Sequence, residues 1–162
     1  METRITIQHQ VLEMNHDFND YTYNLEVHLG LLSPEILPGL QNDAASMVGF
    51  LENLGGGEEM VLFTIFEHGN LLRLKGTPAN AKQYLVGNPV IALKMTREDI
   101  RAGLYAPLRI LVYENKDGIV VVEYDLPSSL FAQLNNEKIN TVALSLDEKL
   151  LKLIKLADLP NE

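Results

Sequence analysis

The sequence contains no cysteine. This absence excludes disulfide bonds, a thiolate nucleophile, and zinc or iron–sulfur sites built on cysteine ligands. The chain also lacks any apolar run near the roughly 20 residues that cross a membrane, and its start, METRITIQHQ, lacks the apolar region of a signal peptide. We therefore expect a cytoplasmic protein with no membrane partner.

Positive charge is scarce as well. The chain has 13 Lys and Arg residues against 22 Asp and Glu residues, which gives a formal net charge of -9. Such a surface repels the phosphate backbone of nucleic acids and anionic membrane surfaces. We expect no nucleic-acid partner.

The remaining composition is typical of a globular protein. The chain has 162 residues, of which 46% are hydrophobic and 22% charged. A chain of this length can bury about 70% of its unfolded surface, so it folds without a metal or a disulfide. Because no repeat or flexible linker divides it, we predict a single domain over residues 1–162, with an N-terminal extension over 1–32 and a core over 33–157.

The N-terminal extension is predicted to be a β-hairpin. Apolar residues alternate loosely over residues 4–12 and more strictly over 21–29, which is the pattern of half-buried strands. Residues 15–20 between them (NHDFND) favour a turn.

Three helices are predicted after the hairpin. The first spans 33–54, is interrupted at Pro38-Gly39, and ends at three glycines, 55–57. The second lies between residues 88 and 101, with Asn88 as its N-cap and Pro89 at its first position. The third is long and closes the chain, because Ile139, Val142, Leu146, Leu150 and Leu153 share one helical face.

Strands are predicted between these helices. Residues 60–66 are almost entirely apolar and indicate a central strand, while 108–113 and 119–124 form a hairpin around Asp117-Gly118. Residues 68–86 leave two alternatives, a continued hairpin through Leu71, Leu72 and Leu74 or a helix over 79–86. The whole pattern predicts an α+β fold in which helices cover one face of an antiparallel sheet.

Three stretches carry a family resemblance: Gly87–Pro89 (GNP), Leu104–Glu114 (LYAPLRILVYE) and Tyr124–Phe131 (YDLPSSLF). In this order, and with Glu67-His68-Gly69 upstream, they resemble the domain of unknown function 302 family, and more narrowly a bacterial subgroup of it. The resemblance covers about residues 60–134. It implies a compact α+β fold of order β-α-β(4)-α, similar to one half of the TATA-box-binding protein, to which the hairpin over 1–32 is an addition. It implies no activity, substrate or cofactor.

Four residues are the candidates for ligand binding: His68, Asn88, Tyr105 and Arg109. A histidine at a strand end can exchange protons near neutral pH, although a turn histidine bonded to the backbone has the same sequence context. The guanidinium of Arg109 suits a carboxylate or phosphate, or else an ion pair across the 108–124 hairpin with a glutamate, Glu114 or Glu123. The segment Gly87–Pro89 can present N–H groups to an anion, or it can simply cap the following helix.

Catalytic residues, metal ligands and cofactors are not predicted. Ser128 and Ser129 lack the G-x-S-x-G context of a serine nucleophile and instead favour a helix cap. His9, His16 and His28 lack the spacing of a helical zinc pair.

Three functions follow from these observations. The first is a binding module for a small polar or anionic molecule that can also form a homodimer. The second is an enzyme in which His68 is the general acid or base and Arg109 holds an anion. The third is a protein-interaction module that pairs through an exposed strand edge at residues 4–12 or 21–29.

Overall fold

The computed structural model describes residues 2, 4–31, 49 and 60–160. The predicted helix over 33–54 and the glycines at 55–57 lie outside the described residues. The elements in chain order are β1 (His9–Glu13), α1 (Phe18–His28), β2 (Gly30–Leu31), β3 (Val61–Phe66), α4 (His68–Arg73), β4 (Ala81–Gly87), α5 (Pro89–Thr96), the 3-10 helix η1 (Ile100–Tyr105), β5 (Leu108–Glu114), β6 (Val120–Asp125), α6 (Pro127–Phe131), the 3-10 helix η2 (Ala132–Leu134) and α7 (Glu137–Leu156).

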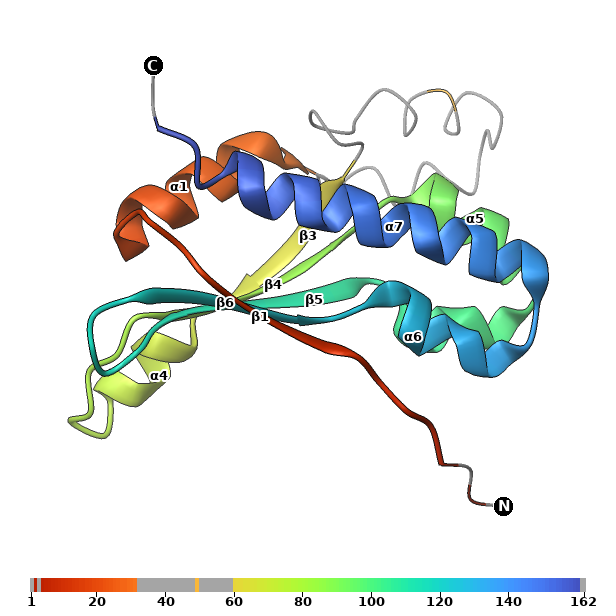
Figure 1. The fold of residues 1–162 in the computed structure, drawn as a ribbon. Helices are drawn as coiled ribbons and strands as arrows, with labels where there is room; N and C mark the ends of the chain where they lie inside the picture. The colour runs from red at the N-terminus through yellow and green to blue at the C-terminus, as the bar shows by residue number, and fades with distance from the viewer. Residues whose placement is uncertain (1, 3, 32–48, 50–59, 161–162) are drawn as a thin grey trace.

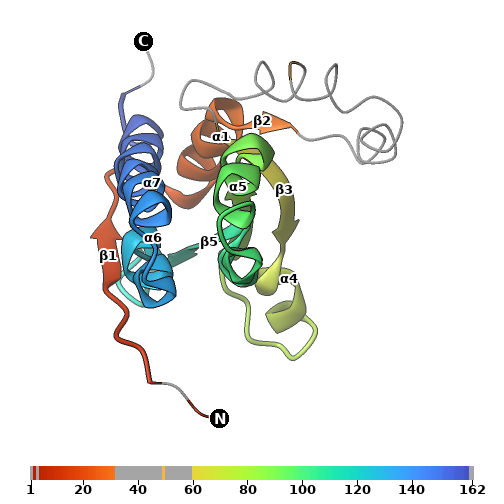
Figure 2. The same ribbon diagram turned by 90° about the vertical axis from the view of Figure 1, so that its right-hand side faces the viewer.

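The strands form one sheet in the order β1-β6-β5-β4-β3-β2. All neighbours are antiparallel except β2 and β3, which are parallel. Helices α1, α5 and α7 lie on one side of this sheet, as Figures 1 and 2 show. The predicted α+β fold, an antiparallel sheet packed against helices, is confirmed.

The core lies between the sheet and these helices. On β5, Leu108, Ile110 and Val112 are buried, whereas the alternate residues are more exposed. On α7, Leu146, Leu150 and Leu153 are at most 2% exposed, as the spacing of three and four residues predicts for one buried helical face. The closing helix is therefore confirmed.

The predicted N-terminal hairpin is wrong, because residues 18–28 form helix α1 instead of a strand. The carboxylate of Asp17 accepts hydrogen bonds from the backbone N–H of Asn19 (2.9 Å) and Asp20 (3.0 Å) and caps the helix. Tyr21 and Leu25 are fully buried, while Tyr23, the alternate residue in the strand pattern, is 68% exposed. Only β1 remains of the hairpin, and it pairs with β6.

Residues 68–86 form helix α4 followed by strand β4, so neither predicted alternative is correct. Gly69 lets α4 turn back against the chain that leads into β4. A Cβ atom at Gly69 would collide with the backbone carbonyl of Ala79. The strand predicted at 60–66 is present as β3, but it lies next to the short edge strand β2.

One predicted turn is confirmed, and one cap is corrected. The 108–124 hairpin is present as β5 and β6, with Gly118 at a φ of 77° in the turn. Neither Ser128 nor Ser129 caps α6, whose N-cap is Leu126. The Ser129 hydroxyl accepts from the backbone N–H of Gln8 (3.0 Å) and thereby ties the start of β1 to α6.

None of the described helices is both long enough and apolar enough to cross a membrane.

Candidate functional site

Two of the four candidate residues line one pocket under η1, which we call the η1 pocket. It has a volume of about 480 Å³. Its lining residues are Leu85, Leu104, Tyr105, Ala106, Pro107, Leu108, Arg109, Asp125 and Leu130. Tyr105 ends η1 and Arg109 lies near the start of β5, so the short segment between them brings both residues to the same pocket.

The local structure fixes both side chains at this pocket. The Tyr105 ring packs edge-on against Phe131, with 5.8 Å between ring centroids. Arg109 pairs with Leu85 of β4 and is exposed between the buried residues Leu108 and Ile110. Because side chains alternate along a strand, Arg109 projects from the sheet face opposite α1 and α7.

The Arg109 guanidinium is only weakly compensated. Its nearest carboxylate is that of Asp125, with 4.0 Å between Nη2 and Oδ2, and its side chain is 64% exposed. Within the described residues, neither this guanidinium nor the Tyr105 hydroxyl makes a hydrogen bond. The predicted ion pair of Arg109 with Glu114 or Glu123 is wrong, because its nearest acid is Asp125, two residues beyond Glu123 on β6.

A polar network on the same sheet face adjoins the pocket, and the sequence analysis missed it. Nδ1 of His9 lies 2.8 Å from Asp125, and Nε2 lies 3.0 Å from Glu123. The Tyr113 hydroxyl donates to the other oxygen of Glu123 at 2.6 Å. Because ionised carboxylates only accept hydrogen bonds, both ring nitrogens of His9 act as donors in this arrangement, which favours the imidazolium form of the ring. We call this set, His9, Tyr113, Glu123 and Asp125, the His9 network.

The electrostatics of the network agree with its geometry. The hydrogen bond to Asp125, followed by that to Glu123, raises the pKa of His9 above its usual value. The hydrogen bond from Tyr113, followed by that from His9, lowers the pKa of Glu123. The Asp125 carboxylate thus interacts with both His9 and Arg109, so it does not fully neutralise the charge of either side chain.

Asn88 lies at a second, adjacent pocket of about 350 Å³, which we call the α5 pocket. It is lined mainly by apolar residues, among them Phe63, Ile91, Met95, Pro107, Phe131 and Leu146. The Asn88 side chain accepts from the N–H of Val90 (2.8 Å) and Ile91 (3.1 Å). The predicted cap is therefore confirmed, and these two N–H groups already have an acceptor.

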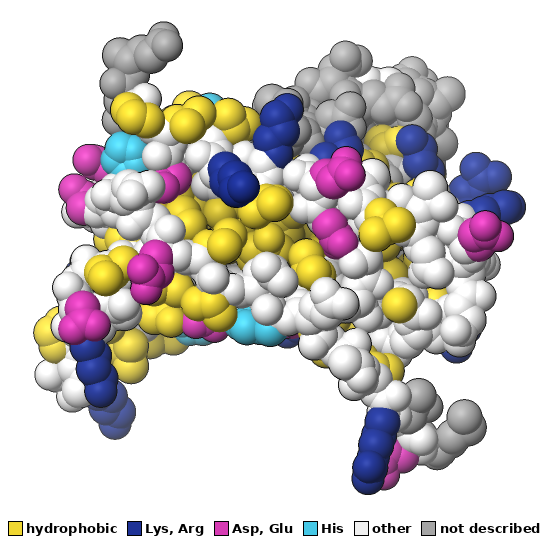
Figure 3. Space-filling model, viewed as in Figure 1, with side chains coloured by type: hydrophobic (Ala, Val, Ile, Leu, Met, Phe, Trp, Pro, Cys, Tyr) yellow, Lys and Arg dark blue, Asp and Glu magenta, His cyan; other side chains and the backbone are white. Residues whose placement is uncertain are grey.

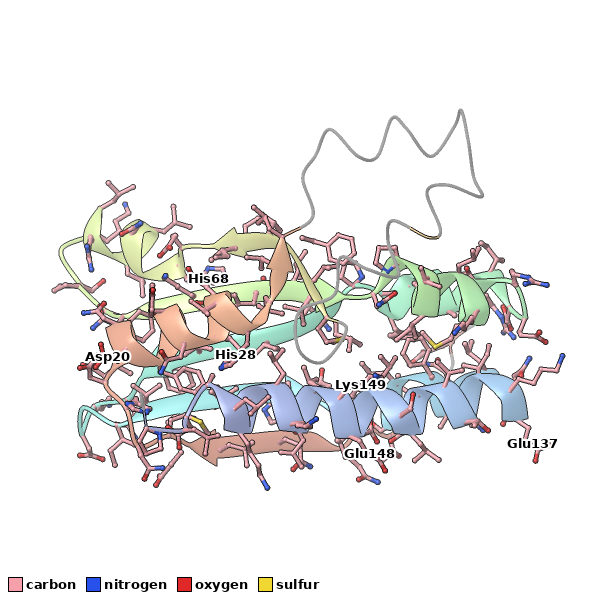
Figure 4. All side chains as sticks on the ribbon, turned by 90° about the horizontal axis from the view of Figure 1, so that it is seen from above. Asp20, His28, His68, Glu137, Glu148 and Lys149 are labelled. Carbon is pink, nitrogen blue, oxygen red and sulfur yellow. The ribbon has the colours of Figure 1, made fainter. Side chains whose placement is uncertain are left out.

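His68 lines neither pocket. His68 is the first residue of α4 and follows the end of β3, where Phe66 pairs with Gln83 of β4. Arg109 lies on β5, two strands away from β3, and pairs with Leu85 of β4. Strand spacings place the two residues about 15 Å apart. Figure 4 shows His68 at the α4 end of the molecule, away from the end that carries α5. The structure does not bring His68 and Arg109 together.

Metal binding has no visible basis in the described ranges, where no group of three or more His, Asp or Glu residues has the arrangement to hold an ion.

Comparison with known proteins identifies the family. The crystal structure of an uncharacterized conserved DUF302 protein from Bacillus stearothermophilus has a similar fold, with a TM-score of 0.66 and 17% sequence identity. The match covers 92% of this chain and 97% of that one. No curated protein matches this sequence. A family profile, described as "Domain of unknown function DUF302", matches residues 40–157. This match spans most of the chain and confirms the resemblance seen in the sequence, so the protein belongs to the DUF302 family.

Proposed function

We propose that this protein is a binding module that holds a small amphipathic anion in the η1 pocket. Arg109 is the partner of the anionic group, and the apolar wall receives the rest of the molecule. The observation that carries this proposal is an arginine at the rim of a pocket without a hydrogen-bond partner among the described residues.

The chemistry of the guanidinium supports an anionic ligand. A guanidinium presents several N–H donors in a fixed plane, and this fork matches a carboxylate or a phosphate. Asp125 is too far away to satisfy these donors, and its Oδ1 is already bonded to His9. A ligand anion would therefore gain donors that none of the described protein groups uses, and the Tyr105 hydroxyl can add one more.

The size and lining of the pocket support an apolar portion in the same ligand. The volume of about 480 Å³ lies within the range of small-molecule sites. Leu85, Leu104, Leu108 and Leu130 supply apolar lining to the same pocket. A short aliphatic or aromatic carboxylate or phosphate has the matching distribution of charge and apolar surface.

Thermal denaturation with defined probes tests this function. Octanoate and octyl phosphate are the probes, and 1-octanol is the uncharged control. A probe at 100 times its Kd adds about 2.7 kcal/mol and raises the Tm by about 5–10 °C in a domain of this size. We expect such a shift with at least one anionic probe and none with 1-octanol.

Variants assign the effect to the pocket. Arg109→Gln is expected to abolish the probe-induced shift while changing the Tm of the free protein little. Arg73→Gln removes an exposed arginine on α4, outside the pocket, and should leave the shift intact. Equal shifts in both variants would place binding elsewhere, and no shift in the wild type would reject this ligand class.

The enzyme hypothesis gains no support from the geometry. It requires His68 to act on a group held by Arg109, and the two residues lie at different ends of the sheet. We assign His68 no role in the proposed site.

A further inference from the structure

Strand β1 is one of the two edge strands of the sheet, and within the described residues no strand pairs with its outer side. The backbone N–H of Met14 bonds to Val120 (2.8 Å), and that of Leu126 bonds to Gln8 (2.8 Å). In an antiparallel ladder, alternate residues face the neighbouring strand, so even-numbered residues of β1 bond to β6. The N–H and C=O groups of His9, Val11 and Glu13 therefore point outward.

This edge lacks three of the devices that usually prevent pairing. Exposed edges are commonly protected by proline, lysine or a bulge. The β1 sequence, HQVLE, contains no proline or lysine, and its register with β6 is continuous. Val11, at its centre, is 57% exposed.

We propose that a second copy of this chain pairs antiparallel with β1, about a two-fold axis at Val11, and extends the sheet across both copies. The sequence of the strand is self-complementary in this register. Val11 meets the partner's Val11, and on each side His9 meets the partner's Glu13. Directly opposed side chains of opposite charge favour pairing, whereas like charges oppose it.

This register places no two like charges directly opposite each other. The two carboxylates of the His9 network favour the cationic form of the His9 ring by accepting from both its nitrogens. Glu13 is exposed and has no hydrogen bond or ion pair to its side chain in the part of the chain that the structure describes. In the paired copies each Glu13 carboxylate lies beside the partner's His9 ring, whose two nitrogens remain bonded to Glu123 and Asp125.

The surface beside β1 extends the same interface. Asp147 of α7 accepts from the N–H of Ser128 (2.8 Å) on α6, and Asp158 accepts from the N–H of Asn15 (2.7 Å), so this side of α7 faces β1. Leu144 and Leu151 lie on the same helical side, and Leu144 is 59% exposed.

Figure 3, which has β1 and α7 in front, shows hydrophobic side chains gathered across the middle of this surface. A two-fold axis perpendicular to the sheet would place both α7 helices on the same face, with these leucines toward each other.

This proposal is independent of the η1 pocket, and sedimentation equilibrium tests it on the full chain. Between about 1 and 100 µM, the wild-type protein should reach twice the 18.1 kDa chain mass. Val11→Pro removes an outward N–H without removing a bond to β6, and should leave a folded monomer. Val11→Lys places like charges at the two-fold axis and should also give a monomer.

Two further variants complete the test. Leu31→Lys introduces the same charge at the opposite edge, on β2, where Leu31 is 70% exposed, and should remain dimeric. Glu13→Lys should weaken association about tenfold, since it places a second positive charge opposite the partner's His9 at both symmetric positions. Circular dichroism identifies folded variants, so Val11→Lys decides the matter if Val11→Pro does not fold. A monomeric wild type, a dimeric Val11→Lys or a monomeric Leu31→Lys overturns the proposal.

Discussion

At the scale of single residues, His9 links protonation to stability. A histidine whose pKa is higher in the folded than in the unfolded state stabilises the fold below its unfolded pKa of about 6.5. This contribution is lost as the pH rises through the folded-state pKa. The raised pKa of His9 therefore predicts that His9→Gln destabilises the protein more at pH 6 than at pH 9.

Urea denaturation of both proteins at pH 6 and pH 9 measures this difference. The charged groups that face His9 are the carboxylates of Glu123 and Asp125, with the Arg109 guanidinium beyond them. His28→Gln is the control, because His28 makes no ion pair within the described residues. An equal loss for His9→Gln at both pH values would contradict the prediction.

At the scale of elements, α1 depends on its N-cap. The Asp17 carboxylate accepts two backbone N–H groups that otherwise lack partners. Asp17→Ala should therefore reduce the free energy of unfolding by about 1 kcal/mol, and Asp17→Asn, which keeps the acceptor, by only a few tenths. Chemical denaturation of the two variants at one protein concentration makes the comparison. An Asn variant as unstable as the Ala variant would mean that the cap is not the cause.

Elements with strong local signals were predictable from the sequence, and α1 was not. The hairpin of β5 and β6 has Asp117-Gly118 in its turn, and α5 has Asn88-Pro89 at its start. In α1, apolar residues occupy both the alternating positions and the helical ones, so the pattern fits two structures. Packing chooses the helix, because Tyr21 and Leu25 then reach the core together and the Tyr21 hydroxyl bonds to the carbonyl of Ile154 on α7 (3.1 Å).

The candidate site was predictable only where its residues are close in sequence. Tyr105 and Arg109 reach one pocket because a short segment joins them. The His9 network was missed because β1 pairs with β6, and His9 and Asp125 lie 116 residues apart. The alternation of apolar and polar residues shows which side chains share a face of a strand, but it does not show which strand pairs with it. His68 was grouped with Arg109 because both lie in the ordered family motifs, and the order of motifs along the chain does not determine the distance between two side chains.

At the scale of the whole molecule, the N-terminal residues belong to the core. Phe18, Tyr21 and Leu25 are 6%, 0% and 0% exposed, and three such side chains contribute about 5 to 9 kcal/mol. This approaches the entire stability of a typical domain. A chain that starts at Gly30 should therefore show no cooperative thermal transition by circular dichroism.

A shorter truncation provides the matched control. Removal of residues 1–7 keeps Gln8, whose carbonyl accepts from Leu126, and should change the Tm by no more than a few degrees. A cooperative transition in the chain that starts at Gly30 would show that β1 and α1 are dispensable.

The contact between the two ends of the described chain also has a consequence for synthesis. Asn15 bonds to Asp158, 143 residues later, and Tyr21 of α1 bonds to Ile154 of α7, so both contacts form only after α7 has been made. At 5–20 residues per second, a ribosome needs about 7 to 30 s to make the intervening chain. Throughout that time the apolar residues of α1 lack the cover that α7 provides. We therefore expect chaperones that recognise exposed apolar segments to bind the nascent chain before its fold closes.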